Sequence, residues 1–300
     1  EGNWRIDPAR DALRMANHTR VYHTKPSRQE VFDAVTKQFY SGEGAIQFAP
    51  EAIARSNRDL LDTEEKRCKF IELYCDEGRD IAAAYLTLQD DTDRPMDAQE
   101  RRHRMNRYGL NPCGEILGTD FHCNLSEIHL NILDPNNFEE QALAFKAGAL
   151  AAGALLHHRF DVPRYQESRE LDPIVGVSFT GLFDFFVHAF GADWLRWFVA
   201  GRPDTPEGKA FKKTEASYLM RWRKVVETTL AEYCAKHDLK MPNRCTTVQP
   251  AGTKSLLTGA SSGWHPPKSQ RFIRRVTFRK NDPVALACID YGYSVVPSQS

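Results

Sequence analysis

The stretch that most constrains this chain is Asn111-Pro112-Cys113-Gly114-Glu115-Ile116, where a proline and a glycine flank one cysteine. Pro112 restricts a backbone dihedral and donates no hydrogen bond, while Gly114 accepts backbone conformations closed to other residues. This composition suits a stiff loop tip better than a sheet interior. Side chains two residues apart in extended backbone point the same way, so Asn111, Cys113 and Glu115 are predicted to face one pocket. The alternative is an ordinary turn with one buried cysteine, and the residues alone leave both interpretations open.

The rest of the chain alternates between patterns typical of helices and of strands. Ser27 and Glu30 have the spacing of a capping box, and Asn137 is predicted to cap a long alanine-rich helix with Glu140 three residues on. The apolar run at 174–179 is typical of a buried strand. Strands that alternate with long helices predict an α/β fold with parallel strands.

The overall composition excludes some classes of function. Forty basic and forty acidic residues cancel, so we expect no general electrostatic attraction to nucleic acid or membrane. No apolar run reaches the roughly 18 residues of a membrane span, and no signal peptide opens the sequence. With seven cysteines and no regular disulfide pattern, a reducing cytoplasm is predicted. Charged residues crowd the stretch 87–108, including Arg101-Arg102-His103-Arg104, and are predicted to form exposed surface.

No metal site is predicted. Cys68 and Cys75 lie one heptad apart, but no second pair has metal-ligand spacing, so core packing is the expectation for both.

A second loop, at 250–259, follows a strand-like segment at 246–249 and is predicted to open a helix. Gly252 lets the backbone approach a ligand, and the amides of 252–255 with Thr253, Lys254 and Ser255 would form a cradle for an anion. The segment is not a Walker loop, because the glycine expected earlier in that motif is absent. The alternative is a helix cap with an ordinary exposed lysine.

Both loops resemble those of ribonucleotide reductases. The resemblance is carried by Asn-Pro-Cys-Gly-Glu-Ile at 111–116, Cys-Asn-Leu-x-Glu at 123–127 and Pro-x-Gly-Thr-x-Ser-Leu-Leu at 250–257. The first motif is more similar to the adenosylcobalamin-dependent class (class II) than to the class that takes its radical from a separate subunit. The run at 249–267 is most similar to the monomeric branch that reduces triphosphates.

This resemblance implies an α/β fold of a particular kind, the ten-stranded α/β barrel of ribonucleotide reductases, with a thiyl radical on a central finger loop. Residues 1–300 would be a single catalytic barrel domain, present only in part, and the finger loop would span about 109–127. The regions that read a deoxynucleotide effector would lie outside this chain.

The resemblance also assigns roles to residues. Cys113 matches the radical cysteine, Glu115 the carboxylate near the substrate 3′-hydroxyl, Asn111 the amide that orients the substrate, and Cys123 one member of the reducing pair. Neither Cys68 nor Cys75 has a context that matches the other member. The loop that holds the substrate phosphates matches Ala251, Gly252, Thr253, Lys254 and Ser255.

The implied function is the reduction of ribonucleotides, expected to be triphosphates, to 2′-deoxyribonucleotides with oxidation of a cysteine pair. The implied cofactor is adenosylcobalamin, and the implied partners are the ribonucleotide substrate and a thioredoxin-like or other thiol reductant. Two alternatives stay open: a reductase large subunit whose radical comes from a partner protein, and a nucleotide-binding fragment without turnover.

Overall fold

The computed structural model describes residues 19–41, 44–92, 94, 96–267, 269, 271, 273 and 275–297. The chain divides into two compact units, Glu1–His265 and Pro266–Ser300. The first unit contains α1 (Arg28–Ser41), α2 (Ala49–Ser56), α3 (Glu64–Asp76), α4 (Arg79–Leu88), α5 (Ala98–Met105), α6 (Phe138–Ala154), α7 (Pro163–Leu171), α8 (Leu182–Val199) and α9 (Pro206–Lys236), and the second contains α10 (Pro283–Asp290). Short 3₁₀ turns lie at Leu130–Ile132, Leu155–His157 and Lys254–Leu257.

The described strands pair in twos, and two of the three pairs are parallel. The pairs are β1 (Thr19–Tyr22) with β2 (Ala45–Phe48), parallel; β3 (Gly109–Leu110) with β4 (Leu117–Gly118), antiparallel; and β5 (Asn124–His129) with β6 (Val175–Thr180), parallel. The segment predicted as a strand at 246–249 adds a single parallel bridge between Thr246 and Val177. The prediction of a mixed α/β fold is therefore confirmed.

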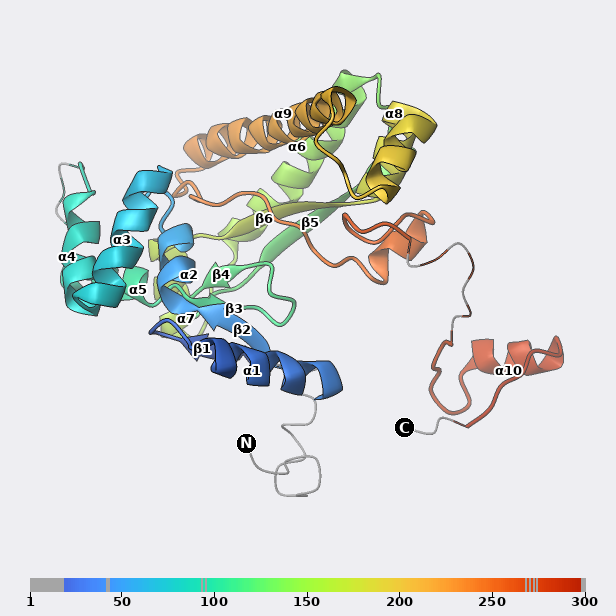
Figure 1. Cartoon of the computed structure of the whole chain (residues 1–300), viewed down its shortest axis with the longest axis horizontal. Coiled ribbons are helices and arrows are strands. Elements are labelled where there is room, and N and C mark those ends of the chain that lie inside the picture. The colour runs from blue at the N-terminus through green and yellow to red at the C-terminus, as the bar shows by residue number, and fades with distance from the viewer. Residues whose placement is uncertain are drawn as a thin grey trace. The chain divides into compact units, whose positions relative to one another are not determined.

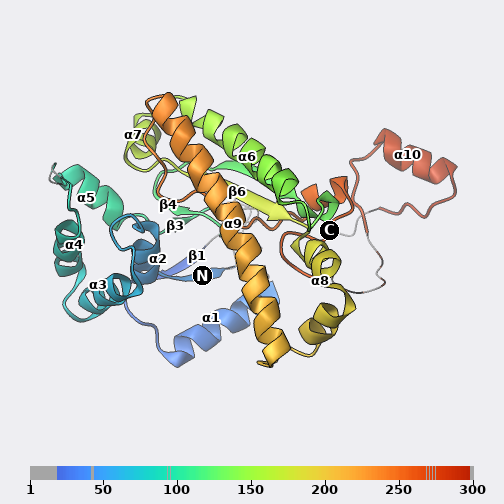
Figure 2. The same ribbon diagram turned by 90° about the horizontal axis from the view of Figure 1, so that it is seen from above.

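The larger core lies between the β5–β6 sheet and the helices that follow each of its strands. In both Figure 1 and Figure 2, α6 and α9 lie side by side across this sheet. Gly148 of α6 makes the close approach possible, because a Cβ there would lie 2.6 Å from the Ile128 side chain of β5. Trp222 of α9 is buried, stacks on Phe145 at 5.1 Å and donates a hydrogen bond to Gln141 Oε1 at 2.9 Å.

Local signals account for several helix starts. The Ser27 N–H donates to Glu30 Oε2 at 2.7 Å while the Glu30 N–H donates to Ser27 Oγ at 3.2 Å, which confirms the capping box before α1. Asn137 Oδ1 accepts from the Glu140 N–H at 3.1 Å and caps α6 as predicted.

A second hydrophobic core holds α2 to α5 together, around Ile53, Phe70, Leu86 and Met105. Cys68 and Cys75 of α3 are exposed, so the prediction that they pack in a core is wrong. Within the described residues, no three His, Cys, Asp or Glu side chains are grouped so as to hold a metal ion. None of the helices in the described ranges combines the length and apolar character that a bilayer crossing requires.

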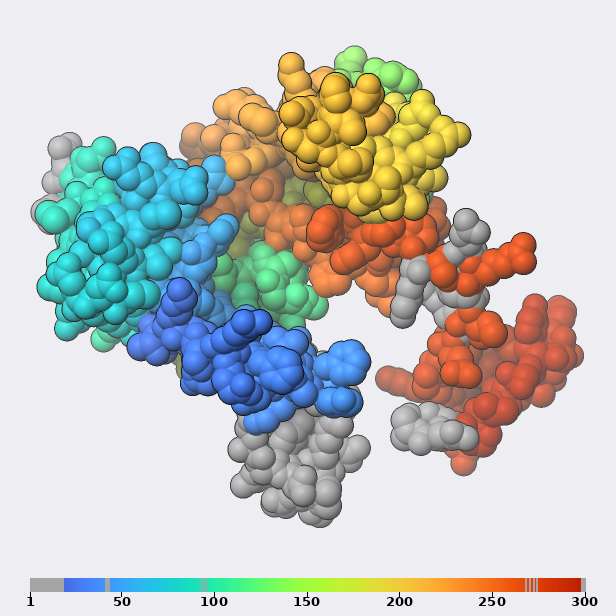
Figure 3. Space-filling model, in the orientation of Figure 1, coloured from blue at the N-terminus to red at the C-terminus, as the bar shows by residue number. Residues whose placement is uncertain are grey.

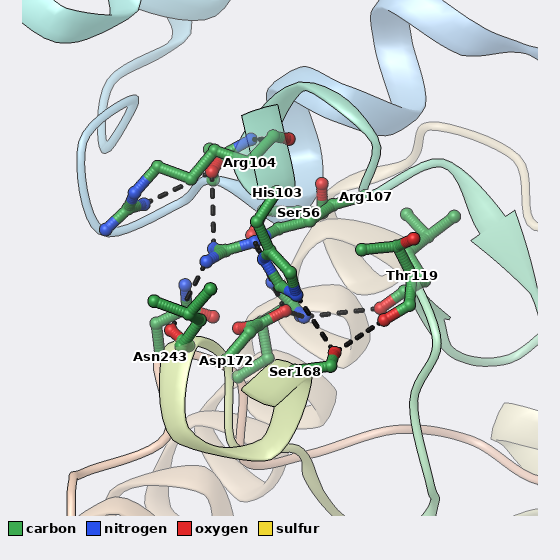
Figure 4. A network of polar contacts seen from close by, with 12 residues as sticks. Ser56, His103, Arg104, Arg107, Thr119, Ser168, Asp172 and Asn243 are labelled. Atoms are coloured by element: carbon green, nitrogen blue, oxygen red, sulfur yellow. Dashed lines mark hydrogen bonds and ion pairs between the residues drawn. The ribbon is translucent and has the colours of Figure 1, made fainter. Parts of the chain in front are cut away.

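The charged stretch at 87–108 is only partly exposed, which corrects the prediction made for it. Arg104 is 6% exposed and Arg107 is 1% exposed. Figure 4 shows why: these residues lie in a polar network with Asp172 and residues of other elements. Arg107 Nε lies 3.4 Å from Asp172 Oδ2, and Arg244 lies 2.6 Å from the same oxygen. The charges are buried because each finds a partner that is distant in sequence.

Candidate active site

The loop predicted to carry the chemistry is the tip of the β3–β4 hairpin. The Gly114 N–H donates to the Asn111 carbonyl at 2.9 Å, and Gly114 has a φ of +78°, which favours glycine. The loop is thus a closed turn, and the prediction of extended backbone through Asn111, Cys113 and Glu115 is wrong. Asn111 Oδ1 accepts a hydrogen bond from the Ile116 N–H at 3.0 Å, so the Asn111 side chain stabilises the turn.

The hairpin nevertheless brings Cys113, Glu115 and Cys123 together. Burial, followed by the nearby Glu115 carboxylate and Cys113, raises the pKa of the Cys123 thiol to about 11. Cys123 is therefore a neutral thiol at physiological pH. Cys113 is exposed at the turn, and Figure 3 shows this green part of the chain reaching the surface between the blue and orange segments.

Glu115 is anchored through its backbone carbonyl, and one oxygen of its carboxylate has no hydrogen-bond partner among the described residues. Thr247 Oγ1 donates to the Glu115 carbonyl at 2.8 Å, which fixes the turn against the strand-like segment after Cys245. The carboxylate oxygen Oε2 is buried and accepts no hydrogen bond from the described residues. A buried carboxylate oxygen without a hydrogen-bond partner is costly, so this oxygen is an acceptor that a bound ligand could satisfy.

The sheet behind this turn has one polar face. Residues paired in a parallel register point the same way, so Glu127 of β5 shares a face with Ser178 of β6, and His129 shares it with Thr180. The opposite face, with Ser126 and its neighbours, packs on α6, where Ser126 Oγ donates to the Gly148 carbonyl at 2.8 Å. The polar face is therefore the one available to the site.

The second predicted loop lies over the same polar face. Ala251 is buried in a left-handed conformation with a φ of 52°, which costs a non-glycine residue free energy. A Cβ placed on Gly252 would meet no atom within 4 Å, so the backbone there borders open space. Among the described residues, the N–H groups of Gly252 and Thr253 make no hydrogen bond, whereas the Ser255 N–H donates to the Ala251 carbonyl at 3.1 Å.

Two of the side chains predicted to form the anion cradle instead contact other residues of the protein. Ser255 is buried, and its Oγ lies 3.5 Å from Ser262 Oγ. Lys254 turns inward to contact Gln249 Oε1 and lies 3.1 Å from Glu127 Oε2.

Sequence reasoning assigned no role to Glu127, although this residue ends the motif Cys-Asn-Leu-x-Glu. The available signal was alternation: Cys123, Leu125 and Glu127 are two residues apart, which places them on one face of a strand. β5 begins at Asn124, directly after Cys123, so Glu127 lies on the strand that follows this cysteine.

Comparisons with known proteins find ribonucleotide reductases. No protein-family model matches the chain. A curated adenosylcobalamin-dependent ribonucleoside-triphosphate reductase from Levilactobacillus brevis is 28% identical over 198 residues, covering 63% of this chain and 26% of the relative. A protein of the same name from Lacticaseibacillus paracasei is 26% identical over 254 residues, covering 81% of this chain and 33% of the relative. A crystal structure of a B12-dependent (class II) ribonucleotide reductase matches with a TM-score of 0.39 and 25% identity over 53% of this chain and 23% of that one.

The curated relatives confirm the resemblance drawn from the sequence motifs. The chain spans about a quarter to a third of the length of these relatives.

Proposed function

We propose that this chain carries the radical and reducing site of an adenosylcobalamin-dependent ribonucleotide reductase that acts on ribonucleoside triphosphates. The observation that carries the proposal is the grouping of Cys113, Glu115 and Cys123, with one buried Glu115 oxygen that has no partner among the described residues. The named activity of the curated relatives supports it. The proposed architecture is the ten-stranded barrel with a finger loop over about 109–127.

The proposed reaction assigns one task to each side chain. Cys113, as a thiyl radical, removes the hydrogen atom from C3′ of the ribose and later returns it. Glu115 accepts the proton of the 3′-hydroxyl as the 2′-hydroxyl leaves as water, which is general acid–base catalysis. Two thiols together supply two electrons and two protons, one proton to the departing 2′-hydroxyl and one to C2′, and end as a disulfide, while Glu115 returns its proton to the 3′-oxygen. Cys123 is one of these thiols, and its raised pKa keeps the proton that the reaction needs.

Adenosylcobalamin, when bound, supplies the radical that starts this sequence. The donor has to reach Cys113, and the exposure of this cysteine at the hairpin turn fits that requirement. Residues 251–255 would hold the substrate phosphates, and Asn111 would orient the substrate. The partners of the proposed enzyme are the ribonucleotide and a thioredoxin-like or other thiol reductant, with a deoxynucleotide effector read outside this chain.

The two cysteines can be separated by their different tasks. In the full-length protein with adenosylcobalamin, labelled substrate and thiols, we expect Cys113→Ser to abolish all turnover, because a serine O–H bond is too strong to yield the radical. Cys123→Ser should still allow hydrogen abstraction but not normal reduction, so base and damaged sugar should be released instead of deoxynucleotide. Chromatography of the products distinguishes these outcomes.

The exposed Cys68→Ser is the matched control and should behave as the parent. If Cys123→Ser makes deoxynucleotide at the parent rate over many turnovers, Cys123 is a packed thiol without a redox role. An absorbance change of the cobalt–carbon chromophore on mixing with substrate separates this proposal from a reductase with a partner radical. Nucleotide binding without any product would favour a non-catalytic module.

A further inference from the structure

Glu127 is a buried carboxylate whose charge the proposed mechanism does not use. Its side chain is 5% exposed, and neither oxygen accepts a hydrogen bond from the described residues. Lys254 Nζ lies 3.1 Å from Oε2, and His129 Nε2 lies 4.0 Å from Oε1. The Lys254 ammonium is therefore the main counter-charge of a carboxylate that burial would otherwise make costly.

Lys254 belongs to the loop proposed to hold phosphates, but its ammonium lies against Glu127. Its ammonium contacts Gln249 Oε1 as well as Glu127, and Gln249 is itself held by its N–H, which donates to Ser178 Oγ at 2.8 Å. The Lys254 side chain is 47% exposed, so it can rotate outward, while the backbone of Glu127 is held in β5 by its pairing with β6. Open space borders the neighbouring Gly252.

We propose that Glu127 is a positioning residue that competes with bound phosphate for Lys254. In the free protein, Glu127 neutralises the lysine and keeps it on the polar face of β5. A phosphate chain on the loop at 251–255 carries more charge than one carboxylate and draws the ammonium outward, with His129 left beside Glu127. Small anions do not gain the lysine contact. This inference rests on the proposed phosphate-binding role of the loop.

Two opposing effects determine whether a Glu127 substitution strengthens or weakens phosphate binding. Glu127 restricts the rotamers of Lys254, and a lysine already ordered would lose less entropy when it binds phosphate. Glu127 also cancels the charge of the lysine, so the ammonium must leave a carboxylate partner at 3.1 Å before it can pair with phosphate. In a partly buried site the interaction between full charges outweighs the rotamer freedom of one side chain. Removal of the charge should therefore strengthen phosphate binding.

The test is a double-mutant cycle on nucleotide binding in the full-length protein. Calorimetric titration with CTP and with inorganic triphosphate is expected to show roughly three- to tenfold tighter binding to Glu127→Gln, the size typical of one charge pair. Lys254→Met should weaken binding. In the Lys254→Met background, Glu127→Gln should change the affinity less than about twofold, because the competition no longer exists. Glu72→Gln is the matched control, since Glu72 pairs with Lys69 at 3.2 Å on α3.

Each other result overturns the inference in a distinguishable way. Weaker binding to Glu127→Gln would mean that the carboxylate orders the lysine for the ligand. An equal gain with and without Lys254 would mean simple repulsion by Glu127, and no gain would mean that the pair is inert. If the parent protein binds neither probe, the proposed phosphate loop itself is wrong. Near-ultraviolet circular dichroism of each variant checks that the fold is retained.

Discussion

At the scale of single residues, the hydrogen bonds of His103 define its protonation state. Arg107 Nε donates to His103 Nδ1 at 3.3 Å, and Ser168 Oγ donates to the Thr119 carbonyl at 2.6 Å. His103 Nε2 lies 2.9 Å from Ser168 Oγ and must therefore be the donor of that bond. The imidazole is neutral, with every polar atom satisfied. A second proton on Nδ1 would face the N–H of Arg107.

This arrangement predicts acid sensitivity. Burial, followed by the charge of Arg107, lowers the pKa of His103 from 6.5 to about 4. Between these values the unfolded chain binds a proton that the native state does not, so stability falls as the pH drops from about 6.5 to about 4 and levels off below. The loss amounts to up to about 3 kcal/mol.

Urea unfolding at several pH values in this window measures the effect. His103→Gln should lose the one-proton slope between pH 6.5 and 4, while the exposed His188→Gln on α8 should keep it. An unchanged slope in His103→Gln would show that His103 titrates normally in the native state.

At the scale of elements, the loop at 251–255 combines strain with open space. Ala251 holds a left-handed backbone that ordinary residues avoid, whereas Gly252 has no positive φ and no atom within 4 Å of an added Cβ. A side chain on Gly252 therefore enters space proposed for phosphate and disturbs no packing.

We expect Gly252→Val to lower nucleotide triphosphate affinity by roughly tenfold or more while the unfolding temperature changes little, as for exposed loop substitutions. Calorimetric titration and thermal unfolding measure the two effects. Gly259→Val is an instructive comparison, since Gly259 also borders open space but has a φ of +68°, so it should lose stability. Unchanged affinity in Gly252→Val would remove the phosphate assignment.

At the scale of the described chain, a polar network connects two hydrophobic cores. Asp172 lies between Arg107, next to α5, and Arg244, which precedes the bridge at Thr246. Arg244 also donates to the Leu117 carbonyl at 3.2 Å, and Ser168 donates to that of Thr119, so the network supports the base of the hairpin. Its members are widely separated in sequence, and those labelled in Figure 4 range from Ser56 to Asn243.

Asp172→Asn should therefore destabilise the protein by about 3–5 kcal/mol, because the buried Arg107 and the partly buried Arg244 lose their shared counter-charge. It should also separate the unfolding of the two cores. Three of the five tryptophans, Trp194, Trp197 and Trp222, lie in the larger core, so tryptophan fluorescence reports mainly on that core, while far-ultraviolet circular dichroism reports on all helices.

We expect the two signals to unfold at different urea concentrations in Asp172→Asn and together in the parent. Asp62→Asn is the control, because its pair with Lys66 is solvent-exposed and should contribute little to stability. Coincident transitions in Asp172→Asn would show that the apolar contacts alone couple the cores.

The sequence by itself determined the elements whose signals are local. The capping box at Ser27 and Glu30, the Asn137 cap and the apolar run of β6 each depend on neighbours within a few residues, and each is present in the structure. The motifs also identified Cys113, Glu115 and Cys123 as a group, which stays a prediction, and in the structure Glu115 and Cys113 lie near enough to Cys123 to raise its pKa.

Only the tertiary structure decided what depends on partners distant in the chain. Arg104 and Arg107 lie in a charged stretch that predicts exposed surface, yet Asp59 and Asp172, which are distant in sequence, pair with them in the fold. Lys254 was expected to face a ligand, but a carboxylate 127 residues earlier holds it. Periodicity describes which side of an element a residue occupies, whereas burial of a charge depends on what packs against that side.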